Sequence, residues 1–208
     1  MLAPCAPSKI IALWNNFHAL AAKIGKPAPE HPLYLIKPST CVLGTGQQIE
    51  RPFDYRGKIA FEGELGIVIA RRCHNVSAAE ANDYVFGYTC VNDVTAIGVL
   101  NENADFTQWC RAKGYDTFGS LGPAIVTDLD WRAASVVTRL DGTERQRYAL
   151  SDMIFAPQEL VSLISRDMSL LPGDVIACGT SLGVGSIPDG SSVEVTIDGI
   201  GSLANTLA

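Results

Sequence analysis

Two glutamates and an aspartate are the residues of this chain most able to do chemistry. Glu62 and Glu64 stand two positions apart at the start of an apolar, β-branched run, and Asp93 ends a later run of the same kind. Because residues two apart on a strand point to the same face, the two glutamate carboxylates should converge. Burying like charges together is costly unless a cation compensates them. Hard oxygen ligands, with no cysteine or histidine cluster nearby, favour magnesium, manganese or calcium over zinc. The same spacing also fits an exposed strand end with nothing bound.

The elements that must position these carboxylates are mostly strands. β-Branched composition and turn residues predict strands over 33–37, 60–70, 85–92, 123–128, 135–140, 175–178 and 192–197. A short strand followed by a helix is expected over 9–25, and a second helix over 151–164 with Pro157 near its start. Ser77 and Glu80 form a capping box that predicts a short helix over 77–84. This pattern indicates an α+β fold, mostly β, in a single domain spanning residues 1–208.

Composition excludes several classes of protein. The 208 residues are 47% hydrophobic and 18% charged, which is typical of a chain with a packed core. A net charge of −6 without a basic stripe argues against a general nucleic-acid binder. No apolar run reaches membrane-spanning length and no secretory signal is recognisable, so we expect a cytoplasmic protein with no membrane partner. The six cysteines lack a CxxC pair, which argues against a zinc site and against a disulfide framework.

Several motifs, taken in order, resemble the single-domain form of the fumarylacetoacetate hydrolase family. They are Leu35-Ile36-Lys37-Pro38-Ser39-Thr40, Glu62-Gly63-Glu64-Leu65, Gly87-Tyr88, Asn92-Asp93-Val94-Thr95-Ala96, residues 113–123, residues 172–180, and Gly183 with Gly185. The resemblance implies a β-roll or distorted barrel with a few short helices, and a homodimer. It also implies magnesium or a similar ion held by two glutamates and an aspartate, which match Glu62, Glu64 and Asp93.

The resemblance further implies roles around the metal. Lys113 stands where the family has a lysine beside the substrate, and we expect it to stabilise an enolate or orient the substrate. Thr180 matches a threonine that holds the substrate's carboxylate, with Gly179 allowing close backbone approach. Tyr115 is expected to line the pocket, together with the neighbouring Asp116. Without the resemblance, the lysine would be an ordinary surface residue and the glycine-rich loop around Gly179 only a turn.

Two positions depart from the family pattern. Hydrolytic members activate water with a histidine and a glutamate, and Leu20 and Lys23 stand at those positions here. His18 is a candidate substitute as catalytic base, and Glu30 with His31 is a second possibility. After Asp93, the family's substrate-binding arginine is replaced within Ala96-Ile97-Gly98, unless Arg111 or Arg145 takes its place.

Together these features favour a divalent-metal-dependent enzyme that acts on a 2-oxo acid through an enolate. Decarboxylation or isomerisation in aromatic-compound catabolism fits best, because neither reaction needs activated water. Hydrolysis of an acylpyruvate such as fumarylpyruvate is one alternative. A metal-binding protein without catalysis is the other.

Overall fold

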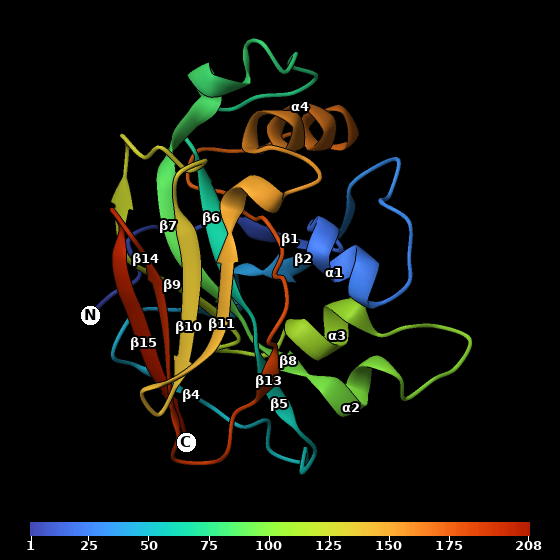
Figure 1. Cartoon of the computed structure of the whole chain (residues 1–208), viewed down its shortest axis with the longest axis vertical. Coiled ribbons are helices and arrows are strands. Elements are labelled where there is room, and N and C mark those ends of the chain that lie inside the picture. Colours follow the sequence, from blue (N-terminus) through green and yellow to red (C-terminus); the bar gives the residue numbers. More distant parts are fainter.

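Three β-sheets form the framework of the computed structural model, which describes residues 1–208 (Figure 1). A seven-stranded sheet runs in the order β2 (Leu33–Pro38), β1 (Lys9–Trp14), β12 (Val175–Ala177), β6 (Gly63–Ile69), β7 (Val85–Asp93), β9 (Gly119–Val126) and β3 (Val42–Leu43). A five-stranded sheet consists of β11 (Thr143–Ala149), β10 (Ser135–Leu140), β14 (Ser192–Ile197), β15 (Gly201–Leu207) and β4 (Gln48–Ile49). A small sheet joins β13 (Gly185–Ser186), β5 (Ile59–Phe61) and β8 (Thr95–Ala96).

Four short α-helices lie around the sheets. Figure 1 shows α1 (His18–Lys23), α2 (Ile97–Leu100) and α3 (Trp109–Lys113) on one side, near the small sheet, and α4 (Pro157–Asp167) across one end of β6 and β7. Single 3₁₀ turns occupy Ser39–Cys41, Ala81–Tyr84 and Leu150–Asp152. None of the helices has the length and hydropathy needed to cross a bilayer.

The core explains why β6 is an unbroken apolar run. All seven of its residues are buried, because both faces of the seven-stranded sheet are covered. One face carries Val68 and Val91 in a cluster with β1 and β12, and the other packs Leu65 against the five-stranded sheet. That second sheet alternates instead, with Val195 facing inward between half-exposed neighbours on β14.

Most predicted elements are present. The predicted strands 135–140 and 192–197 match β10 and β14, and the strand–helix pair within 9–25 matches β1 and α1. The mostly β, α+β fold class is confirmed.

Three expectations are corrected, and two strands of the five-stranded sheet were not expected. The predicted strand over 60–70 is divided into two strands, β5 and β6, at Glu62. At this break the Glu62 N–H donates to Asn92 Oδ1 at 3.0 Å. Residues 77–84 make the expected Ser77–Glu80 bond, but only one 3₁₀ turn fits before β7 begins. The helix over 151–164 starts only at Pro157, where a missing N–H costs nothing. Strands β11 and β15 were not predicted, since their polar residues hide the alternation.

Candidate metal centre and active site

The three carboxylates meet at one point of the fold. Asp93 ends β7, Glu64 is the second residue of β6, and Glu62 lies in the break before β6. One oxygen from each lies within 4.8 Å of the other two. Glu64 and Asp93 are buried, whereas the Glu62 side chain is 18% exposed. The expected convergence is therefore present, but it depends on the break at Glu62 and not on one continuous strand.

Glu64 is a buried carboxylate with one oxygen unused. Its Oε2 accepts a hydrogen bond from the Gly179 N–H at 2.9 Å, while Oε1 has no hydrogen-bond partner. Burial, followed by repulsion from Asp93 and Glu62, raises the Glu64 pKa well above its usual value. A buried carboxylate with an oxygen that has no donor, close to two other carboxylates, is suited to a cation.

Asp93 lies between two buried lysines. Lys113 Nζ is 2.6 Å from Asp93 Oδ2 and 3.0 Å from Glu62 Oε1, and Lys37 bonds Asp93 Oδ1 from the other side. Burial alone would raise the Asp93 pKa, but Lys113 and Lys37 outweigh it and lower that pKa. Burial would likewise lower the Lys113 pKa, yet Asp93, Glu62 and Glu64 raise it. Both partners of the Lys113–Asp93 pair are therefore charged at neutral pH.

The charges and spacing fit a divalent cation. With all three carboxylates ionised and both lysines protonated, the cluster has a formal charge of −1, which a divalent ion would change to +1. One oxygen of each carboxylate lies within 4.8 Å of the other two, so one ion could contact all three after small side-chain movements. The donor set, all carboxylate oxygen, is also the one that these ions prefer.

The glycine-rich loop that follows β12 passes directly over these carboxylates. Gly179 adopts a φ of +89°, which turns its N–H toward Glu64. Gly183 passes so close to the Arg145 carbonyl that any Cβ would overlap it. The Thr180 hydroxyl donates to the Gly63 carbonyl at 3.1 Å and accepts from Gln146 Nε2 at 2.9 Å, so it is already engaged within the protein. The Thr180 backbone N–H has no acceptor in the protein and is available to a ligand.

Sequence reasoning assigned no role to four residues that shape this site. Lys37 and Thr95 lay inside recognised motifs without an assigned role, and Gln146 and Tyr148 reach Gly63 from β11. The Thr95 hydroxyl donates to Glu62 Oε1 at 2.8 Å and accepts from Lys113 at 2.6 Å. A signal for Lys37 did exist, because strand alternation puts it on the same buried face as Leu35.

Other predicted site residues lie apart from the carboxylates. His18 is the exposed first residue of α1, and no hydrogen bond or ion pair joins it to the cluster. Arg111 pairs with Glu102 at the surface. Arg145 is exposed, and on β11 it points away from the face that carries buried Gln146. Neither arginine contacts the carboxylates.

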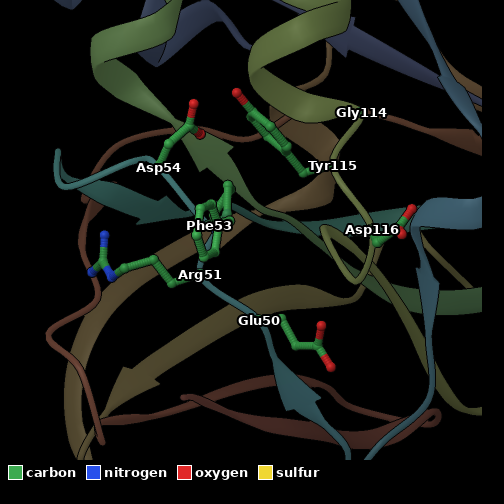
Figure 2. Close-up of a pocket in the computed structure, with 8 residues that line it drawn as sticks. Glu50, Arg51, Phe53, Asp54, Gly114, Tyr115 and Asp116 are labelled. Atoms are coloured by element: carbon green, nitrogen blue, oxygen red, sulfur yellow. The ribbon is translucent and has the colours of Figure 1, made fainter.

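Tyr115 lines a surface cavity of about 570 Å³ (Figure 2). Its ring packs against Phe118 at 5.4 Å between centroids. The cavity is bordered on the opposite side by Phe53 and Asp54, and Asp116 also lines it. None of the three clustered carboxylates lines this cavity, so Tyr115 and Asp116 face a neighbouring surface and not the carboxylates themselves.

The fold and this site define a class of protein, and comparison with known proteins identifies it. The family model for the fumarylacetoacetate (FAA) hydrolase C-terminal domain matches residues 9–208. This chain belongs to the fumarylacetoacetate hydrolase family.

Individual relatives are consistent with this family assignment. The chain is 44% identical to 5-carboxymethyl-2-hydroxymuconate delta-isomerase from Mycobacterium smegmatis, whose crystal structure superposes with a TM-score of 0.92 over 100% of this chain and 81% of the other. It is 41% identical to 2-hydroxyhepta-2,4-diene-1,7-dioate isomerase from Mycobacterium marinum, with a TM-score of 0.90 over 100% and 77% of the two chains. It is 36% identical to the oxaloacetate tautomerase of Bacillus subtilis, over 97% of this chain and 70% of that protein. The relatives are thus enzymes named as isomerases and a tautomerase.

Proposed function

We propose that this protein is a divalent-metal-dependent isomerase or tautomerase of a 2-oxo acid, with magnesium or manganese as the ion. The observation that carries the proposal is the unpartnered, buried Glu64 Oε1 in a group of three converging carboxylates, two of which pair with Lys113. The names of three relatives support the reaction class.

Glu62, Glu64 and Asp93 are the residues that would hold the ion. When bound, the ion would act as a Lewis acid on the substrate's oxygens and stabilise negative charge during enolisation. Lys113 would supply a second fixed positive charge beside those oxygens. The neighbouring carboxylates raise the Lys113 pKa in the metal-free protein, and we assign Lys113 the role of a protonated electrostatic stabiliser.

The loop after β12 would orient the substrate. The unbonded N–H of Thr180 is available to a carboxylate, and the glycines on either side let the ligand approach the backbone. A net positive charge in the metal-loaded cluster would favour the anionic substrate.

Isomerisation is favoured over hydrolysis by the residues on α1. Leu20 and Lys23 stand where hydrolytic relatives carry their water-activating pair, and neither can serve as a general base there. Enolisation and proton return need no attacking water. We further propose a homodimer, following the family resemblance; light scattering during gel filtration tests this separately.

The test is turnover of a substrate panel by the metal-free protein before and after adding magnesium or manganese. The panel contains oxaloacetate, 5-carboxymethyl-2-hydroxymuconate, 2-hydroxyhepta-2,4-diene-1,7-dioate and fumarylpyruvate, with isomers, carbon dioxide and released acids all quantified. We expect metal-dependent isomer formation that Lys113→Met lowers by about 10²–10³-fold. The exposed Lys26→Met variant is the matched control and should retain activity.

The products decide between reactions. Carbon dioxide release would identify a decarboxylase, and two acids from fumarylpyruvate would identify a hydrolase and direct attention to His18. Metal binding without turnover of any substrate would favour a non-catalytic family member. Absence of metal binding would refute the proposal.

A further inference from the structure

The peptide unit at Gly63, between the two clustered glutamates, lacks a strand partner on one side. Strand β12 pairs with β6 only from Val68 to Gly66, and the last backbone bond runs from Cys178 N–H to Leu65 O at 2.8 Å. The chain then turns away at Gly179 to reach Glu64. The N–H and C=O of Gly63 on this side would be buried and unpaired if nothing replaced the missing strand.

Three side chains replace it. Gln146 Oε1 accepts from the Gly63 N–H at 3.0 Å. The Gly63 carbonyl accepts from the Thr180 hydroxyl at 3.1 Å and also from the Tyr148 hydroxyl. Gln146 Nε2 donates to Thr180 Oγ1 at 2.9 Å, which closes the network. We call Gln146, Tyr148 and Thr180 the Gly63 clamp.

The clamp is rigidly supported. Gln146 and Tyr148 are two apart on β11 and share its buried face. The Tyr148 ring packs edge-on against Phe17, with centroids 4.9 Å apart. Burial and the nearby Glu64 raise the Tyr148 pKa well above its usual value, so the hydroxyl stays a donor. On the opposite side, the Thr138 hydroxyl fills the space that a side chain at Gly63 would need.

A glycine between two metal-binding residues lets the distance between their carboxylates vary, unless other contacts fix the backbone conformation of the glycine. Gly63 has the widest backbone freedom of any residue type, and a rotation there would move Glu62 relative to Glu64. We propose that the Gly63 clamp is a positioning device that holds Glu62 and Glu64 at the spacing required by a small divalent cation. Tyr148 is the positioning residue most specific to it. This inference rests on the metal site proposed above.

The size of the ion provides the test. Magnesium demands near-ideal octahedral geometry at about 2.0–2.1 Å, whereas calcium accepts about 2.3–2.6 Å and irregular coordination. Tyr148→Phe keeps the ring packing and removes one donor, so the site should loosen without unfolding. We expect magnesium affinity, measured by calorimetry without substrate, to fall about tenfold, and calcium affinity to fall less than about threefold.

Tyr34→Phe is the matched control. It also removes a tyrosine hydroxyl, which donates to Asp167 at 2.9 Å at the surface, and neither residue belongs to the clamp or to the carboxylate cluster. Its magnesium-to-calcium ratio should equal that of the wild type. Thr180→Val removes the other donor to the same carbonyl and should shift the ratio in the same direction as Tyr148→Phe.

The outcomes separate the two proposals. A lowered ratio in Tyr148→Phe or Thr180→Val, but not in Tyr34→Phe, supports the clamp. A wild-type protein that binds magnesium while both clamp variants keep the wild-type ratio overturns the clamp alone. A wild-type protein that binds neither ion overturns the metal site, and the clamp with it.

Discussion

Replacing Glu64 by glutamine should stabilise the metal-free protein while removing its response to metal. Glu64→Gln keeps the side-chain shape and an oxygen for the Gly179 N–H, but eliminates one negative charge from the cluster. Two unit charges 4.8 Å apart repel by roughly 3.5 kcal/mol at an effective dielectric constant of about 20. Lys113 offsets part of the repulsion from Asp93 and Glu62. A net gain of about 1–3 kcal/mol in the free energy of unfolding remains.

The gain should depend on pH with a defined sign. The Glu64 pKa is raised in the folded protein, so the folded state binds a proton more tightly than the unfolded state does. Linkage then makes wild-type stability fall as pH rises above the unfolded carboxyl value of about 4.3 and toward the folded pKa. The glutamine in Glu64→Gln does not ionise, so the stability of this variant does not fall with pH for this reason. Its advantage should be near zero at about pH 4 and should grow as pH rises toward the folded Glu64 pKa.

Urea unfolding followed by tryptophan fluorescence, with chelator and then with magnesium, measures both effects. Magnesium should stabilise the wild type and leave Glu64→Gln unchanged, because the variant loses a charged ligand. Glu80→Gln is the control: Ser77 lowers the pKa of this exposed carboxyl, so neutralising it should give no gain at any pH and no change in metal response. Metal-free Glu64→Gln that is less stable than wild type at pH 8 would refute the reasoning.

Two further variants test the charges around the site and the anchoring of β1. Lys37→Met should lower the free energy of unfolding of the metal-free protein by about 3–5 kcal/mol, because it leaves buried Asp93 with Lys113 alone. The same variant should bind magnesium more tightly, because the cluster becomes more negative. An unchanged free energy of unfolding in urea together with an unchanged magnesium affinity in calorimetry would contradict this. Asp174→Asn should cost about 2–3 kcal/mol near neutral pH, since Asp174 accepts from the Ser8 hydroxyl at 2.6 Å and pairs with Lys9. Burial opposes ionisation, but Lys9 and Ser8 lower the Asp174 pKa, so this contribution exists above about pH 3.9 and disappears as pH falls through the folded pKa. A deficit that persists in acid would contradict the charge-based origin.

Local sequence patterns were sufficient for two strands of the five-stranded sheet. The runs 135–140 and 192–197 alternate or contain β-branched residues throughout, and they form β10 and β14. Strand β15 was missed because Asn205 and Thr206 interrupt its apolar alternation, and only pairing with β14 makes it a strand. The roles of His18 and Tyr115 stay predictions, as do the single domain over residues 1–208 and the homodimer.

The sequence by itself determined the family, the mostly β fold and the three carboxylates, because their spacing and flanking residues are local and specific. Only the tertiary structure decided how these carboxylates are held. Lys37 reaches Asp93 across 56 residues of sequence, and Tyr148 reaches Gly63 across 85. Such contacts follow from sheet order and from the point where β12 leaves β6, and no local pattern encodes either. Burial then shifts the pKa values of the clustered residues. At a surface the same residues would keep ordinary pKa values and need no cation.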